Sequence, residues 1–197
     1  MSITIEAYED WGVAVGSPAK GTTRTQVTNA NLYSYHDPAQ NYYLNDVPRP
    51  IGESLSDDIQ ICSFKRFICF KVYGTYASFK NAKIVFSAPS TVGTWRIHGK
   101  LTNQYVQPTG TYNSTFGRTL GDYDGTLPTI LGSQVLYPRM STTGPEAATD
   151  RFIRASANTT YWTEWLCLQY MGHPSGWSDV DNFGLDTVQL VLQETEY

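Results

Sequence analysis

The stretch Trp95–Leu101 reads W-R-I-H-G-K-L, and it indicates the fold class of the whole chain. Apolar or small residues alternate there with polar ones: Trp95, Ile97, Gly99 and Leu101 against Arg96, His98 and Lys100. Successive side chains of a β-strand point to opposite faces, so this alternation predicts a strand with one buried and one solvated face. This strand is therefore expected to be part of a β scaffold.

Residues 102–160 follow this strand and show no sustained period, only turn residues and scattered aromatic residues. Compact domains rarely contain an irregular stretch of this length unless it has a function. The sequence therefore predicts a β scaffold with a long irregular insertion around 102–160 that presents a large surface.

Five further segments have the β-branched and aromatic content of strands, bounded by turn residues. They are Ile3–Tyr8, Ile61–Tyr76, Lys83–Ser87, Tyr161–Met171 and Leu185–Glu194, with weaker signals at Trp11–Val15 and Gln26–Tyr33. Asn81-Ala82 is interpreted as a turn before the Lys83 strand. No segment shows a convincing helical period. We expect an all-β chain of about seven to nine strands, folded as one antiparallel β-sandwich domain over residues 1–197, jelly-roll-like or, as an alternative, Ig-like.

Two of these segments carry information about burial. In Ile61–Tyr76 one face is apolar except at Arg66, which interrupts it. In Tyr161–Met171 both faces are largely apolar, so this strand is expected to be central or covered on both sides.

The three cysteines, Cys62, Cys69 and Cys167, form no disulfide or zinc pattern. They are expected to be buried free thiols, which suits a reducing cytoplasm.

The composition argues against several classes of partner. The formal net charge is -4, whereas binding to nucleic acid requires a cationic face. No apolar run reaches the length of a membrane helix, and the N-terminus M-S-I-T-I-E lacks the features of a signal peptide. Charged residues make up 16% of the chain, and 14 Tyr and 5 Trp are present. This composition is typical of a β surface that is partly covered by protein partners.

The sequence predicts neither an enzyme nor a cofactor. The three histidines, His36, His98 and His173, lie in turn-rich segments or on a wet strand face, and no nucleophile-elbow, metalloprotease or phosphate-loop motif is present.

Around Asp179, Asp181 and Asn182 the chain reads D-x-D-N-x-G, part of the spacing of a calcium loop. The acidic twelfth position and flanking helices are missing, so a turn stabilised by Asp and Asn is favoured, as for Gly121–Gly125.

The Trp95 strand and its continuation, W-R-I-H-G-K-L-T-N-Q-Y-V-Q-P-T-G-T-Y, resemble a stretch found in small virion structural proteins of tailed bacteriophages and prophages. Further similar strands are F-K-V-Y-G-T-Y at 70–76, N-A-K-I-V-F at 81–86, T-E-W-L-C-L-Q at 163–169 and T-V-Q-L-V-L-Q-E-T-E at 187–196. The pieces occur in the same order and span most of residues 61–197. The resemblance implies a non-enzymatic role in the particle, at the capsid surface, neck, tail or baseplate.

We therefore expect a virion protein, assembled in the host cytoplasm, that docks on other virion subunits and on copies of itself. The interface candidates are aromatic residues of the predicted loops, a residue class enriched at protein interfaces. They are Tyr105, Tyr112, Phe116, Tyr123, Tyr137 and Trp177. The strand Ile3–Tyr8 is a further candidate, by pairing with a neighbouring chain. The alternative is a carbohydrate-binding attachment module, because the same aromatic residues could stack on sugar rings. Without any partner, these residues would instead pack the loops down.

Overall fold

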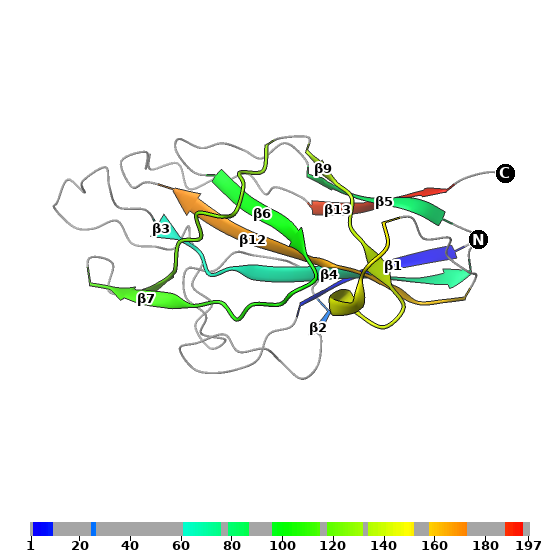
Figure 1. The fold of residues 1–197 in the computed structure, drawn as a ribbon, viewed down its shortest axis with the longest axis horizontal. Helices are drawn as coiled ribbons and strands as arrows, with labels where there is room; N and C mark the ends of the chain where they lie inside the picture. Colours follow the sequence, from blue (N-terminus) through cyan, green and yellow to red (C-terminus); the bar gives the residue numbers. More distant parts are fainter. Residues whose placement is uncertain are drawn as a thin grey trace.

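The computed structural model describes residues 2–9, 25–26, 61–75, 79–86, 96–114, 118–131, 134–151, 158–172 and 188–194. These residues form an all-β, antiparallel structure without an α-helix (Figure 1). The elements are β1 (Ser2–Glu9), β2 (Thr25–Gln26), β3 (Ile61–Cys62), β4 (Arg66–Thr75), β5 (Phe79–Phe86), β6 (Arg96–Thr102), β7 (Gly110–Asn113), β8 (Arg118–Gly121), β9 (Val135–Leu136), β10 (Met140–Ser141), the 3-10 turn η2 (Pro145–Ala147), β11 (Tyr161–Thr163), β12 (Trp165–Gly172) and β13 (Val188–Glu194). No described helix is long and apolar enough to cross a bilayer.

The predicted strands are confirmed over most of their described residues, but Ile61–Tyr76 is broken at Ser63–Lys65 and Tyr161–Met171 is broken at Glu164. The alternation that predicted β6 is also confirmed, since Ile97 and Gly99 are buried whereas Lys100 is exposed. Trp95 and the predicted strand Trp11–Val15 lie outside the described residues. Of Gln26–Tyr33, only Gln26 is described, and it belongs to β2.

The turn predicted at Asn81-Ala82 is wrong, because both residues lie inside β5. β5 pairs with β13, with Val191 opposite Lys83 and Gln193 opposite Lys80. Three steps along β5 therefore match two along β13, which places an extra residue of β5 at this point. The turn-forming residues build a β-bulge, where the strand bends without reversing.

The larger sheet has eight strands and is organised around β4 and β12. Its main path runs β10-β11-β4-β1-β2, and β12 pairs with β3, β4 and β6. Along one edge, β4 changes partner: Arg66–Ile68 pair with β12, and Lys71–Val72 pair with β11. At the junction, the Thr163 hydroxyl accepts a 3.0 Å hydrogen bond from the Phe70 backbone N–H. This contact satisfies a buried donor where the two ladders separate.

A smaller sheet, β13-β5-β9, contributes to the same apolar core as the larger one. The core cluster contains Val72 of β4, Leu166 of β12 and Ile97 of β6, together with Ile84 and Phe86 of β5. Val72, Ile84 and Leu166 are each 0% exposed. Inward-facing residues of both sheets therefore pack together, which is the main source of stabilisation available to this fold.

A second cluster lies on the opposite face of β4 and β12. It is centred on Trp165 and includes Phe67, Cys69, Cys167 and Leu127. Because successive residues of β12 alternate between the two clusters, this strand is buried on both faces, as its apolar pattern predicted. All three cysteines are buried and free, which confirms their prediction as well.

The segment 102–160, predicted to be an irregular insertion, is irregular over most of its described residues but also contains short regular elements. It contains the β7–β8 hairpin, β9, β10 and η2. Residues 128–130 also lie antiparallel along β6, since the Gly99 N–H donates to the Pro128 carbonyl at 2.9 Å and the Ile130 N–H donates to the Ile97 carbonyl at 2.8 Å. These pairings are too short to produce a visible period, so they could not be predicted from alternation.

Candidate interaction surface

The structure separates the predicted interface residues into three groups. Tyr112, Tyr123 and Tyr137 are exposed. Tyr105 is partly buried against the Trp165 cluster, with ring centroids 4.8 Å from Phe67 and 5.9 Å from Trp165. The Tyr105 ring therefore packs against the protein's own core and is not presented to a partner as predicted. Phe116 and Trp177, and the calcium candidates Asp179, Asp181 and Asn182, lie outside the described residues.

Tyr112 and Tyr123 belong to one structural unit, the hairpin–loop unit, which comprises residues 110–114 and 118–127. Tyr112 lies on β7, and Tyr123 follows β8 by two residues. Their exposed fractions are 64% and 55%, which is high for large aromatic side chains. Figure 1 places β7 at one end of the molecule, away from the start of β1. Tyr137 follows β9 and lies outside this unit.

Two glycines bring the hairpin against the main sheet. A Cβ atom on Gly121 would lie 2.0 Å from the backbone oxygen of Ser63, and one on Gly110 would lie 2.5 Å from the Phe64 ring. Ser63–Lys65 form the break between β3 and β4 that was absent from the predicted strand. Only glycine allows so close an approach between backbones, so the contact fixes the position of the hairpin.

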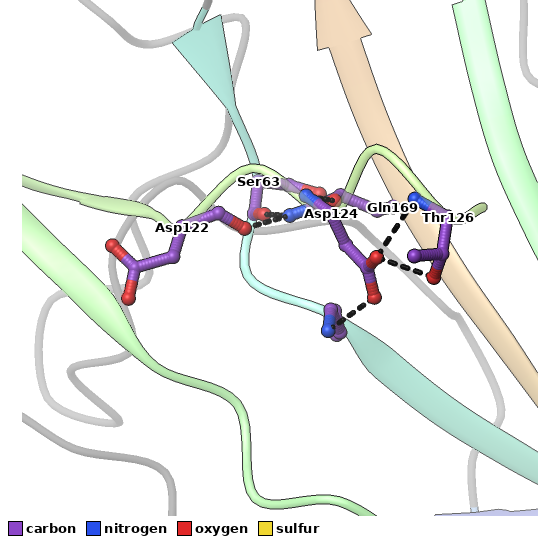
Figure 2. A network of polar contacts seen from close by, with 6 residues as sticks. Ser63, Asp122, Asp124, Thr126 and Gln169 are labelled. Carbon is purple, nitrogen blue, oxygen red and sulfur yellow. Dashed lines mark hydrogen bonds and ion pairs between the residues drawn. The ribbon is translucent and has the colours of Figure 1, made fainter.

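A buried glutamine connects three segments at the same place (Figure 2). Gln169 of β12 is 0% exposed. Its side-chain Nε2 donates to the Ser63 carbonyl at 2.9 Å and to the Asp122 carbonyl at 2.8 Å, and its Oε1 accepts from the Asp124 N–H at 3.3 Å. Gln169 thus uses both its donors and its acceptor on backbone groups of two other segments. This clamp attaches the loop that carries Tyr123 to β12.

The loop is also held by the side chain of Asp124. Its Oδ1 accepts from the Thr126 N–H at 3.0 Å and the Thr126 hydroxyl at 2.6 Å, and its Oδ2 lies 2.5 Å from the Lys65 Nζ. The Lys65 ammonium, followed by the Thr126 hydroxyl, holds the pKa of Asp124 well below its usual range. The bond to the N–H two residues ahead makes this an Asx turn, the interpretation favoured for this type of sequence.

The other carboxylate of Gly121–Gly125 is engaged as well. Asp122 Oδ1 accepts from the Thr111 hydroxyl at 2.5 Å, which links β7 to the end of β8. Both carboxylates of this turn therefore have protein donors. Nowhere in the described residues do three or more His, Cys, Asp or Glu side chains gather as metal ligands would. The chemistry of this loop is that of a rigid scaffold.

A polar and aromatic cluster that was not predicted from the sequence, here called the outer cluster, lies on β1, β4 and β11. Its members are Glu6, Tyr8, Lys71, Tyr73 and Trp162. Lys71 Nζ lies 4.6 Å from the ring centroid of Tyr73, 5.7 Å from that of Tyr8 and 5.8 Å from that of Trp162. Glu6 accepts from the hydroxyls of Tyr8 at 2.8 Å and Tyr73 at 2.7 Å. The bond to Glu6 is the main reason that the pKa of Tyr8 is raised to about 12.

This outer cluster satisfies its own polar groups and fastens β1 and β11 to β4. The sequence shows that Glu6 and Tyr8 share a strand face, as do Lys71 and Tyr73, but the pairing of the strands decides that they meet. Glu6 lies opposite Lys71 in the β1–β4 register, and Trp162 lies opposite Lys71 on the other side. The register between strands that are distant in the chain cannot be predicted from a single sequence.

The chain matches no family model, no curated protein and no solved structure in the comparisons made.

Proposed function

We propose that this chain is a non-enzymatic structural protein of a tailed-bacteriophage particle, which docks on other virion subunits through the hairpin–loop unit. The order of the resembling strands across residues 61–197 supports a particle component. On this proposal the protein takes no cofactor, and its partners are capsid, neck or tail subunits.

The observation that carries the proposal is the combination of exposure and anchoring at Tyr112 and Tyr123. Tyr112 and Tyr123 are both more than half exposed, and Tyr is enriched where proteins bind one another. Here the backbone that presents them is held by the Gly121 contact, the Gln169 clamp and the Lys65–Asp124 ion pair. A pre-positioned aromatic anchor loses little conformational entropy on binding, which favours its use as an interface.

The same proposal extends to the fold. The two sheets are interpreted as the layers of an antiparallel β-sandwich, jelly-roll-like in its connections. The shared core cluster supports this interpretation, because it contains inward residues of β4 and β12 together with Ile84 and Phe86 of β5. Such a double layer would give the hairpin–loop unit a rigid base.

The docking proposal is tested in particles released by the strain that encodes the protein. The wild-type chain and a Leu131→Ala control, which alters a 68% exposed residue outside the unit, should copurify with the particles. The Tyr112→Ala/Tyr123→Ala double variant should be lost from them, while its unfolding midpoint stays within a few degrees of wild type. Absence of the wild-type chain from purified particles, or full retention of the double variant, would contradict the proposal.

A glycan array distinguishes the alternative class, a carbohydrate-binding attachment module. The particle proposal expects no glycan to be retained by the wild-type chain. Retention of a defined glycan that is abolished in the Tyr112→Ala/Tyr123→Ala variant would instead assign the same two side chains to sugar stacking.

A further inference from the structure

The N-terminal strand β1 has an outer edge that is paired at one end only. Among the described residues, its inner edge pairs with β4 over all eight positions, from Ser2 opposite Thr75 to Glu9 opposite Ile68. On its outer edge, β2 pairs only with Tyr8 and Glu9. Within the part of the chain that the structure describes, the outer edge of residues 2–7 has no partner strand. Such an edge presents unpaired backbone donors and acceptors.

The same strand carries exposed apolar side chains beside the core. Ile3 and Ile5 are 37% and 39% exposed, whereas Ala7, on the same face, packs against the main core cluster. Ile5 lies opposite the fully buried Val72 in the β1–β4 register. The isoleucines therefore extend the core face up to the sheet edge, where an added strand would cover them.

The sequence of β1 restricts how two copies could pair along this edge. An antiparallel pairing of identical strands is defined by the residue that lies opposite its own copy. Registers shifted by one position place Ile3 opposite Thr4, which would put the core faces of the two copies on opposite sides. Only registers in which a residue faces itself keep one continuous core face.

A Ser2 centre pairs only one residue of the strand, and an Ala7 centre places Glu6 opposite Tyr8, whose outer edge pairs with β2. Of the four other centres, one satisfies the structure. A Glu6 centre would oppose two carboxylates, which is destabilising in a cross-strand pair. An Ile5 centre would bring Ser2 to Tyr8, whose outer edge is already used by β2. An Ile3 centre pairs only residues 2–4 of the strand. A Thr4 centre pairs residues 2–6, places Ile3 opposite Ile5 twice, and sets Glu6 opposite Ser2.

We propose that β1 mediates self-association of this chain: two copies pair antiparallel through residues 2–6, with Thr4 opposite Thr4, and merge their larger sheets across a two-fold axis. The paired segment is short, so the dimer dissociates on dilution and becomes dominant when copies are held close together. β7 lies away from the start of β1 in Figure 1, so the dimer leaves both hairpin–loop units free. The inference goes beyond the proposed function, because it concerns contacts between copies of this chain, and it is independent of the docking surface.

Cysteine cross-linking tests the register directly in the full-length chain. Residues directly opposite in an antiparallel pair have Cα atoms about 4.5–5.5 Å apart, within the range that a disulfide spans. Thr4→Cys should therefore give a covalent dimer under mild oxidation, and the matched Ile5→Cys variant, whose residue faces Ile3, should not. The native thiols do not interfere, because all three are buried and burial raises the pKa of Cys62 and Cys167 to about 12.

Sedimentation at increasing protein concentration provides the second measurement. Wild type and a Val106→Lys control, altered at a 53% exposed position elsewhere, should show the same concentration-dependent dimer. Ile3→Lys/Ile5→Lys should remain monomeric with an unchanged β-sheet circular dichroism spectrum. A monomeric wild type with no Thr4→Cys cross-link would overturn the proposal, as would equal cross-linking of Ile5→Cys. Neither result would affect the test of particle docking.

Discussion

The Trp165 cluster and the hairpin–loop unit lie on neighbouring parts of β12 but are held together by different forces. Around Trp165, aromatic rings and thiols pack in a buried layer, with the Phe67 ring centroid 6.5 Å away in an edge-to-face arrangement. Leu127, at the end of the hairpin–loop unit, packs in the Trp165 cluster, but the rest of the unit is held mainly by two glycine contacts and a few directed hydrogen bonds that converge on Gln169 and Asp124. Apolar packing is spread over many atoms, whereas each polar anchor depends on one group. The Trp165 cluster should therefore be sensitive to loss of side-chain volume, and the hairpin–loop unit to changes in the geometry of its anchoring contacts.

The largest effect is expected from Trp165→Ala. Trp165 is 0% exposed, and its indole N–H donates to Glu146 at 3.3 Å. Its removal leaves a cavity between Phe67 and Tyr105, which should lower the free energy of unfolding by about 3–5 kcal/mol. Urea denaturation measures this loss. The control Tyr137→Ala, at a half-exposed position, should stay within about 0.5 kcal/mol of wild type. Similar losses in both variants would contradict the assignment of Trp165 to the core.

Gly121→Ala should separate the hairpin from the sheet. The new methyl group would lie 2.0 Å from the Ser63 backbone oxygen, so the backbone must shift at a cost of about 1–3 kcal/mol. Amides of β7 and β8 should exchange faster with solvent, while those around Trp165 keep their protection. In the matched variant Gly125→Ala, the new methyl group meets only the movable Tyr123 ring, at 3.2 Å. Equal behaviour of the two variants would count against the close approach.

Gln169→Met tests the clamp with little change of side-chain volume. The substitution leaves the Ser63 and Asp122 carbonyls and the Asp124 N–H without their buried partner, and each unsatisfied group costs about 1–3 kcal/mol before relaxation. The amide of Asp124 should lose its exchange protection first. Gln104→Met, at an exposed position, is the control. Unchanged protection at Asp124 would show that the clamp does not hold the loop.

The smallest effect is expected from Lys65→Met, and it should depend on pH. The pKa of Asp124 is lower in the folded chain than its unfolded value of about 3.9. Its contribution to stability is therefore present above that pH and is lost as the pH falls towards the folded pKa. The variant should lose about 0.2–1 kcal/mol at pH 7. It should also lose less stability than wild type between pH 5 and pH 2, measured by urea denaturation. An unchanged acid profile would contradict the role of Lys65.

The sequence predicted those strands in which the pattern of apolar and polar residues indicates which faces are buried. Ile97 and Gly99 alternate with polar residues, and their strand has one buried face. The apolar faces of Tyr161–Met171 predicted a strand buried on both sides, as β12 is. Arg66, which interrupted an apolar face, proved to be a buried arginine paired with Glu9, with its Nε 2.8 Å from Oε2. Glu9 lies 57 positions from Arg66 in the chain, so the sequence showed a charged residue on an apolar face but could not show which residue pairs with it.

The candidate surface was predicted less completely. The aromatic residues of 102–160 were found by their composition, yet composition could not separate Tyr105, which packs on Trp165, from the exposed Tyr112 and Tyr123. The anchors of the unit were missed because Ser63, Lys65 and Gln169 are ordinary strand residues by type. Their role depends on which backbone groups come within hydrogen-bond distance after folding.

By itself, the sequence determined the β class, the inward faces of the longer strands and the burial of the thiols, because local alternation and hydrophobicity fix which side of a strand leaves water. Tertiary structure alone decided the register that places Glu6 opposite Lys71, the close approach of Gly121 to Ser63 and the convergence of two segments on Gln169 of β12. Those features join residues distant in the chain, and their free energy is realised only when all partners are in place at once.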